Sequence, residues 1–340
     1  MTVGIDELRA AVSRIYDNTG LLPEEKEVLI DNLIDAELRG VASHGIIRTI
    51  PYYNRMRQGG IRLAAPLTKV KDHHAISVYD ANHGLGQWMA YQAMQSTVHK
   101  ARSYGIGAVS VRNSQHFGAA GYYAKLAADE DMIGLVFTNA SARLAPWGGK
   151  EPLFGNNPWA VAVPTPQKEI PFVLDIANSV TAAGKIRGAL KRGEAIPSGW
   201  AMDENGELTT DPAEALKGIL LPFGEHKGYG ITFAVSILSS LLSAGRSDTE
   251  VTSVDQVEVP QGVSHFFAAI HIDAFQPIEA FKEQMGTLIS QIHTGEKFAN
   301  RDRLYYPGER GYSLKQQALR SGSAKVDQNL WEEISGFVRV

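Results

Sequence analysis

A histidine, His116, lies where a short apolar run gives way to a helical pattern. Residues 105–111 alternate glycine with apolar residues in the manner of a buried strand, and Ser114 is a suitable N-cap for a helix that follows. We therefore expect His116 in the first helical turn. Free backbone N–H groups and the positive end of the helix dipole favour the neutral imidazole there. His116 is thus a candidate acid/base, although an isolated histidine can also be a core or capping residue.

A second segment carries Ser43, His44 and Arg48. The pattern predicts one helix from about residue 23 to residue 39 and another, capped by Ser43, that continues to about residue 60. On that second helix His44 and Arg48 are four residues apart, so both point from one face. A guanidinium grips a carboxylate with two prongs, and a nearby histidine can exchange a proton with a neighbouring oxygen. The pair suits a small hydroxy or keto acid, whereas a surface arginine beside a capping histidine is the ordinary alternative.

The composition favours a globular enzyme. With 340 residues, of which 44% are hydrophobic, the chain can bury a substantial core and form two or three domains. The net charge is only −4 and the basic residues are scattered, so we expect no nucleic-acid surface. No cysteine is present, which excludes disulfides, thiolate metal ligands and a thiol nucleophile. Residues 1–7 lack the basic start and apolar run of a secretory signal, so we expect a cytoplasmic protein.

One stretch without charge, residues 228–245, approaches the length of a membrane span. Serine and threonine dilute it, and no flanking basic cluster or second span supports insertion. We therefore predict a helix buried inside the protein and no membrane contact.

The hydrophobic pattern changes along the chain. Residues 5–60 are helical in pattern, and so is the segment from residue 278 to the end. Between them, short β-branched runs at 75–79, 107–111, 133–137, 159–164, 172–176 and 266–272 alternate with helical stretches. We expect an α/β protein in which residues 71–279 form a mixed sheet with helices. Residues 1–70 and 280–340 are predicted to form one helical domain.

No Gly-x-Gly-x-x-Gly fingerprint is present, so a Rossmann dinucleotide fold is not expected. Two other junctions could receive a phosphate. Residues 172–179 end a strand with capping residues, whose free N–H groups suit an anion. Residues 224–230 combine flexible glycines with Lys227 ahead of a helix. Each junction could equally be an ordinary capped helix.

Five motifs, in order and spacing, resemble the type 2 malate/L-lactate dehydrogenase family. They are Ser43-His44-Gly45 with Arg48, residues 113–118 (Asn-Ser-Gln-His-Phe-Gly), residues 155–158 (Gly-Asn-Asn-Pro), residues 221–228 (Leu-Pro-Phe-Gly-Glu-His-Lys-Gly) and residues 306–309 (Tyr-Pro-Gly-Glu). The resemblance runs from about residue 5 to the end. The family also contains ureidoglycolate dehydrogenase, 2,3-diketo-L-gulonate reductase, sulfolactate dehydrogenase and Δ1-piperideine-2-carboxylate reductase, so it indicates the reaction type better than the substrate.

The resemblance implies NAD or NADP bound in a non-Rossmann α/β domain of a homodimer, with the active site near the subunit boundary. The implied cofactor neighbours are Asn139, Asp175, Ile176, Ala177, Asn178, Ser179, His226, Lys227, Pro307, Gly308 and Glu309. Either His44 or His116 matches the family's acid/base. The helix junction favours His116, and His44 would then orient the substrate oxygen.

The sequence thus predicts an NAD(P)-dependent oxidoreductase that interconverts a small 2-hydroxy acid and its 2-oxo acid. Arg48 would hold the carboxylate and His116 would exchange the hydroxyl proton. A cyclic imine-carboxylate reductase is the alternative within the same chemistry. A metal-dependent hydrolase using His73, His74 and His83 is less consistent, because adjacent strand residues point to opposite faces, and no metal is expected. A non-catalytic metabolite-binding module is the remaining alternative.

Overall fold

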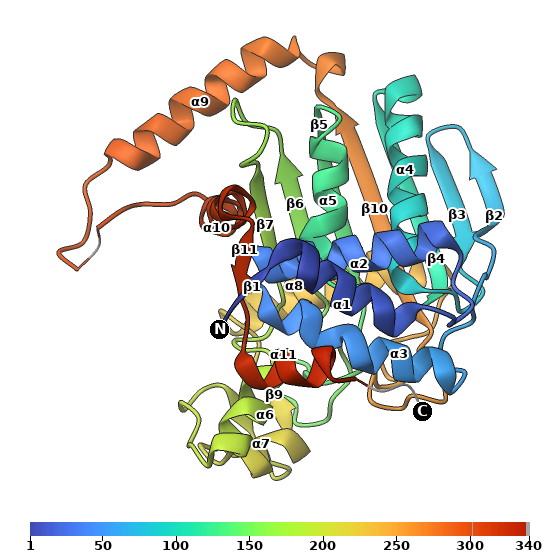
Figure 1. Cartoon of the computed structure of the whole chain (residues 1–340), viewed down its shortest axis with the longest axis vertical. Coiled ribbons are helices and arrows are strands. Elements are labelled where there is room, and N and C mark those ends of the chain that lie inside the picture. The colour runs from blue at the N-terminus through green and yellow to red at the C-terminus, as the bar shows by residue number, and fades with distance from the viewer. Residues whose placement is uncertain (301, 338–340) are drawn as a thin grey trace.

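A mixed seven-stranded sheet lies at the centre of the computed structural model, which describes residues 1–300 and 302–337 (Figure 1). Its strands, in spatial order, are β2 (Thr68–His73), β3 (Ile76–Asp80), β4 (Ile106–Ser114), β10 (Val263–His271), β5 (Met132–Thr138), β6 (Trp159–Val163) and β7 (Phe172–Ile176). Neighbouring strands are antiparallel except β3 and β4. The predicted α/β class with a non-Rossmann mixed sheet is confirmed.

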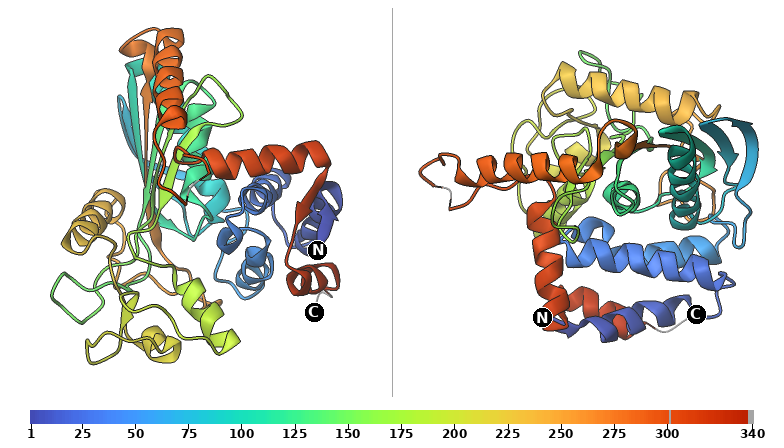
Figure 2. Two further views of the ribbon diagram at one scale, coloured as in Figure 1. Left: turned by 90° about the vertical axis from the view of Figure 1, so that its left-hand side faces the viewer. Right: turned by 90° about the horizontal axis from the view of Figure 1, so that it is seen from above.

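Helices cover both faces of this sheet. Helices α4 (Gly86–Tyr104) and α5 (Ala120–Ala128) pack on one face, and α8 (His226–Ser236) lies on the other (Figure 2). Strands buried from both sides are apolar on both sides, which explains why β5 and β6 are almost continuously apolar in sequence. The main core lies between the sheet, α4 and α5.

The helix predicted over residues 228–245 is present as far as Leu241, but it is not buried inside the protein, because only one of its faces is covered. Helix α8 continues into a short π-helix, η3 (Ile237–Leu241), that packs on β10 with its hydroxyl-bearing residues, including Ser239 and Ser240. The buried serine hydroxyl of Ser239 donates to the carbonyl of Val235, so it needs no outside partner. The opposite face is apolar and open to solvent at Phe233, Ile237, Leu241 and Leu242, with 43–60% of each residue exposed.

Segments from both ends of the chain pack together beside α4 and α5. Helices α1 (Ile5–Tyr16), α2 (Pro23–Leu38) and α3 (Thr49–Arg57) share a core with β11 (Ser323–Lys325) and α11 (Gln328–Ser335), and β11 pairs with β1 (Thr2–Gly4). Helix α10 (Glu309–Ser321) packs against α2. Residues 301 and 338–340 of the predicted helical domain lie outside the described residues.

Helix α9 (Ile278–Thr294) extends away from the body of the protein (Figures 1 and 2). It follows the short 3₁₀ helix η4 (Ile272–Ala274), and none of its residues is buried. Apolar residues nevertheless repeat along it at helical spacing: Ile278, Phe281, Met285, Ile289 and Ile292. This part of the 280–340 segment therefore lies outside the core that α10 and α11 help to cover, and it touches α10 through the contact of His293 with Glu309 at 3.0 Å.

A small unit completes the chain. Helices α6 (Ala183–Arg192) and α7 (Pro212–Lys217) pack with the short paired strands β8 (Ala201–Met202) and β9 (Ile219–Leu220) around their own core. In the part of the chain that the structure describes, no helix is both long and apolar enough to cross a membrane.

Candidate active site

His116 lies in the loop between β4 and α5. Strand β4 ends at Ser114, but α5 begins only at Ala120, so the prediction that His116 occupies a first helical turn capped by Ser114 was wrong. Burial, followed by the charge of Arg48, holds the pKa of His116 well below its usual range. The imidazole is therefore neutral at neutral pH, as expected, but desolvation is the main cause instead of a helix dipole.

His44 lies between α2 and α3, facing His116. The two imidazole rings are stacked, with centroids 5.5 Å apart and planes 12° from parallel. His44 Nδ1 is 2.9 Å from Ser43 Oγ. Burial, then the charges of Arg48 and Arg39, lowers the pKa of His44 to about 4. Two neutral histidines thus stand side by side.

Arg48 does not share a helix with His44. Two short 3₁₀ helices, η1 (Ala42–His44) and η2 (Ile46–Arg48), meet at Gly45, so the prediction of one continuous helix face was wrong. A side chain at Gly45 would collide with Glu37, whose carboxylate accepts the Ile46 N–H at 3.1 Å. This contact interrupts the helix. Arg48 still reaches the site, because its Nε donates to the carbonyl oxygen of Ser43 at 2.8 Å and its charge acts on both histidines.

The loop that carries His116 is fixed through its backbone. The N–H of His116 donates to Gln261 Oε1 at 3.0 Å, and the N–H of Gln261 donates to Gln115 Oε1 at the same distance. Tyr52, on α3, places its hydroxyl 2.6 Å from His116 Nδ1. The buried His265 lies behind this loop and stacks on Phe117.

Two adjoining cavities meet at the histidines. The smaller, about 120 Å³, is lined by His44, His116, Phe117, Gly118, Thr138, Asn139, Ala140, Ser141, Asn156, Pro158, Val254, Gln261 and Val263. The larger, about 370 Å³, is lined by Arg39, Val41, Ser43, His44, Gly118, Ala119, Ala120, Asn156, Pro158, Val173, Asp175, Ile176, Ala177, Ala182, Gly308 and Gly311. The first could hold a small acid. The second brings Ser43 and His44 together with four of the predicted cofactor neighbours.

The residues that line the larger cavity are tightly packed against one another. Gly308 has a positive φ of 89°, and a Cβ there would lie 2.7 Å from the backbone nitrogen of Val173. Asp175 Oδ2 accepts the N–H of Gly121 at 2.9 Å. Burial raises the pKa of Asp175, while the nearby Arg39 opposes that rise. Glycine at position 308 is therefore required by its close packing against β7.

Other predicted cofactor neighbours use their side chains internally. The Asn139 amide is hydrogen-bonded to Ser264, Arg246 and Asp248, and the Asn178 amide to Asn157 and Trp159. Ser179 Oγ donates to the carbonyl oxygen of Thr181. The Glu309 carboxylate binds His293, Arg303 and the N–H of Tyr306. These contacts hold the side chains in place within the protein.

The proposed helix start at residues 175–179 was also wrong. Helix α6 begins at Ala183, and the N–H groups of Asn178 and Val180 are bonded to the carbonyls of Asn156 and Leu221. These N–H groups are therefore not free to bind a phosphate.

The second predicted phosphate junction is exposed, since His226 and Lys227 form the first turn of α8. Pro307 uses its carbonyl oxygen to accept the Val173 N–H.

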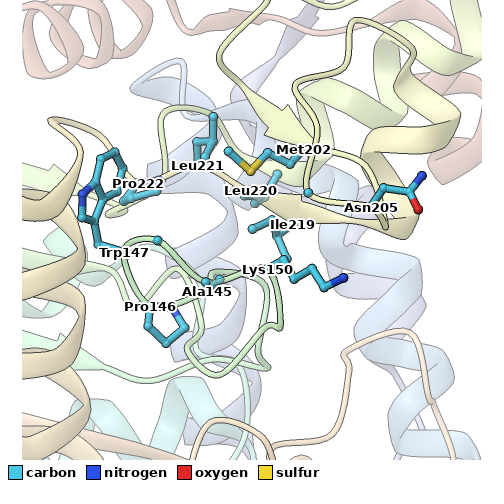
Figure 3. Close-up of a pocket in the computed structure, with 13 residues that line it drawn as sticks. Ala145, Pro146, Trp147, Lys150, Met202, Asn205, Ile219, Leu220, Leu221 and Pro222 are labelled. Carbon is cyan, nitrogen blue, oxygen red and sulfur yellow. The ribbon is translucent and has the colours of Figure 1, made fainter.

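A separate hollow of about 450 Å³ lies beyond residues 219–222 (Figure 3). Apolar side chains including Trp147, Met202 and Leu220 line it, and Lys150 stands at its edge. It contains neither His44 nor His116, so we assign it no part in the chemistry. Across the described residues, no cluster of three histidine, aspartate or glutamate side chains is placed to hold a metal ion.

Sequence reasoning missed several residues that the fold brings to the site: Arg39, Tyr52, Arg55, Gln115 and Gln261. Tyr52 and Arg55 lie about one and about two helical turns beyond Arg48, within a helix that was predicted, so their proximity was a usable signal. Gln261 lies 145 positions from His116 in the chain and had no such signal.

Comparison with known proteins identifies the family that the chain resembles. A family model described as malate/L-lactate dehydrogenase matches residues 3–335. Malate dehydrogenase of Pyrococcus abyssi is 41% identical over 342 residues, covering 98% of this chain and 93% of that protein. L-sulfolactate dehydrogenase of Methanocaldococcus jannaschii is 37% identical over 315 residues, covering 93% and 90%. The solved structure of malate dehydrogenase from Pyrococcus horikoshii superposes with a TM-score of 0.89 at 36% identity, covering 98% of this chain and 93% of that one.

Proposed function

The chain belongs to the malate/L-lactate dehydrogenase family and is an NAD(P)-dependent oxidoreductase acting on CH–OH groups, and within that class we propose that it interconverts a small 2-hydroxy acid and its 2-oxo acid at the paired histidines. The observation that supports this most is the stack of His44 on His116, close enough to Arg48 to feel its charge and next to a cavity of about 120 Å³ that could hold a small acid. Neutral imidazoles next to a fixed cation suit a substrate with a carboxylate beside a hydroxyl or keto oxygen.

In this proposal Arg48 holds the substrate carboxylate. Its Nε is already used by the Ser43 carbonyl, which fixes the side chain and leaves the two terminal nitrogens for the substrate. His116 exchanges the proton of the C2 oxygen, and His44 orients that oxygen with Ser43 behind it. Because both histidines are neutral in the free enzyme, neither repels the positive charge of Arg48.

The larger cavity is the proposed place of the nicotinamide cofactor, NAD or NADP. Its lining includes Asp175, Ile176, Ala177 and Gly308, four residues at which the family resemblance implies cofactor contacts. When bound, the cofactor supplies or accepts the hydride at C2 of the substrate. The exposed Lys227 at the first turn of α8 offers a cation for a phosphate.

The relatives suggest which group the substrate carries at C3. Malate dehydrogenase and L-sulfolactate dehydrogenase are named for acids that differ at C3 in carboxylate versus sulfonate. Both are anions, so we propose a substrate with a second anionic group.

Activity in the cytoplasm stays a prediction.

We also propose that the enzyme works as a homodimer. No residue of α9 is fully buried, and its apolar stripe is only partly covered by the described part of its own chain. The apolar face of α8 and η3 is more open, because Phe233, Ile237 and Leu241 are exposed. A second copy would bury both. Leu241→Glu should shift the sedimentation mass towards one chain, whereas Leu208→Glu, at a similarly exposed leucine of the small unit, should not. A monomeric parent protein would overturn the proposal.

The decisive experiment measures NADH and NADPH oxidation with a panel of 2-oxo acids. Oxaloacetate, sulfopyruvate and pyruvate test the C3 group, and Δ1-piperideine-2-carboxylate tests the imine alternative. We expect kcat/KM to be highest for a dianionic 2-oxo acid. Preference for the cyclic imine would transfer the function to that alternative, and oxidation with none of them would contradict the proposal.

A further inference from the structure

The Nδ1 atom of His116 has two hydrogen-bond partners. The hydroxyl of Tyr52 lies 2.6 Å away and the backbone nitrogen of Gly118 lies 3.3 Å away. A backbone N–H can only donate, so Nδ1 accepts from Gly118. An imidazole nitrogen that accepts a hydrogen bond carries no proton, and the single proton of the neutral ring is then on Nε2.

The direction of the Gly118 N–H is fixed by packing. Gly118 has a positive φ of 84°, and a Cβ at this position would lie 2.1 Å from Oδ1 of the buried Asn32 on α2. Only glycine adopts this backbone beside Asn32 without strain. The N–H therefore cannot turn away from His116 unless the whole loop moves.

Tyr52 has a proton to give. Its side chain is buried in the core shared by α1, α2 and α3, with 1% of the residue exposed. Burial raises the pKa of the Tyr52 hydroxyl to about 12, so the phenol keeps its proton at neutral pH. If Tyr52 instead accepted a proton from Nδ1, that N–H would face the N–H of Gly118. Donation by Tyr52 satisfies all three groups.

We propose that Tyr52 is a positioning residue that, with the N–H of Gly118, keeps the proton of neutral His116 on Nε2, so that His116 meets the substrate as a hydrogen-bond donor. The part played by the substrate rests on the function proposed above, whereas the proton position does not. A keto oxygen can only accept a hydrogen bond, so this form of the free enzyme is matched to binding of the 2-oxo acid. To protonate the C2 oxygen, the ring must take up a second proton from solvent and give one to the substrate, so that His116 ends neutral.

The same reasoning separates the two histidines. The only hydrogen-bond neighbour that the described residues give His44 Nδ1 is Ser43 Oγ, a hydroxyl that both donates and accepts. His44 can therefore change its tautomer by rotation of one hydroxyl, while His116 is held by two donors. The stacked rings look equivalent but differ in which atom can carry the proton.

The test reads the proton position directly by ¹⁵N NMR of histidine-labelled protein. The His116 signals are assigned from their loss in His116→Gln. We expect Nε2 protonated and Nδ1 bare in the parent, a mixture of both forms in Tyr52→Phe, and the parent spectrum in Tyr53→Phe, a matched change on the same helix. A proton on Nδ1 in the parent, or an unchanged spectrum in Tyr52→Phe, would overturn the proposal. If Tyr52→Phe does not fold, the parent spectrum still decides.

Kinetics provides the second readout. Removing one strong hydrogen bond from His116 should lower kcat for 2-oxo acid reduction about 10-fold in Tyr52→Phe, with KM changed less than about 2-fold. A purely structural role would instead lower thermal stability with kcat unchanged, and that result would contradict the proposal. No turnover in the parent, together with a protonated Nε2, would reject the proposed function and leave the tautomer assignment intact.

Discussion

Arg55 Nη2 donates to Oε1 of Gln115, the residue immediately before His116, at 3.1 Å. The same buried guanidinium donates to the carbonyls of Gly60, Val254, Gln256 and Val259. Its terminal nitrogens are satisfied by neutral oxygens alone, although Arg55 is only 1% exposed. It joins α3, the 254–261 loop and the His116 loop into one rigid support.

Arg55→Lys should therefore lower both the stability of the protein and its kcat. A lysine keeps the charge but cannot reach all of these acceptors, and each buried group left unpaired costs about 1–3 kcal/mol. We expect a lower urea midpoint and a lower kcat. The exposed Arg57, two residues further along α3, is the matched control: Arg57→Lys should change neither quantity. Equal urea midpoints for the two variants would contradict the support role.

His116→Ala should lower kcat by about 10²–10⁴, the usual effect of losing a positioned acid/base. Cofactor binding should persist, because His116 lines the smaller cavity and is absent from the lining of the larger one. Steady-state kinetics and NADH fluorescence titration measure the two effects separately. His99→Ala, at an exposed histidine of α4, serves as control. Near-normal turnover in His116→Ala would transfer the acid/base role to His44.

Arg48→Lys should raise KM for the 2-oxo acid about 10-fold or more, because lysine loses the two-pronged grip on a carboxylate. It also loses the Nε contact to the Ser43 carbonyl that fixes the arginine. KM for NADH, measured in the same assays, is the internal control and should not change. If the KM for the acid is the same in both proteins, the carboxylate is held elsewhere.

Lys227→Ala should weaken cofactor binding by about 1.5–3 kcal/mol through loss of a charge-assisted phosphate contact. The side chain is exposed at the first turn of α8, so thermal stability without cofactor should be nearly unchanged. Titrations with NADH and NADPH, compared with Lys191→Ala on α6, test this. Identical dissociation constants in parent and Lys227→Ala would move the phosphate site to another segment.

His265 should make the protein acid-sensitive. It is fully buried between Phe117 and Phe267, and burial lowers its pKa from 6.5 to about 3. Below pH 6.5 the histidine is protonated in the unfolded chain but stays neutral in the folded chain. His265 therefore has no effect on stability above pH 6.5. Below that pH it lowers the free energy of unfolding by about 1.4 kcal/mol per pH unit, down to about pH 3.

The variant His265→Asn isolates this effect, since an amide can replace the Nδ1 contact to Thr138 without titrating. Urea unfolding at pH 7, 6 and 5 should show a shallower loss of stability in the variant than in the parent. Parallel losses would mean that other groups cause the acid sensitivity.

The sheet strands were well predicted from sequence because their apolar runs are bounded by glycine, proline and polar residues. Strand β7 was found at its observed bounds, Phe172–Ile176, and the end of α2 at Leu38 was found within two residues. Strand β2 was missed, since all six of its residues are exposed and give no apolar alternation. Both β2 and β7 are edge strands, so local pattern identifies strands that bury a face and misses a strand that buries none.

The errors at the site have a different cause. Ser114 was predicted to cap a helix, but β4 continues to Ser114 and pairs there with Val263. The predicted helix through His44 is broken at Gly45 by Glu37, a residue of the preceding helix. In both cases a tertiary contact outweighs local propensity, and such contacts are not visible in the spacing of residues.

The pairing of β1 with β11 has a consequence for how the protein forms during synthesis. Val3 and Leu8 share their core with Val326 and Trp331, near the opposite end of the chain. During translation the first helices leave the ribosome long before their packing partners exist, and until then their apolar faces remain exposed. The last thirty or so residues thus act as the closing step of folding, and the newly made chain should depend most on chaperones just before that step.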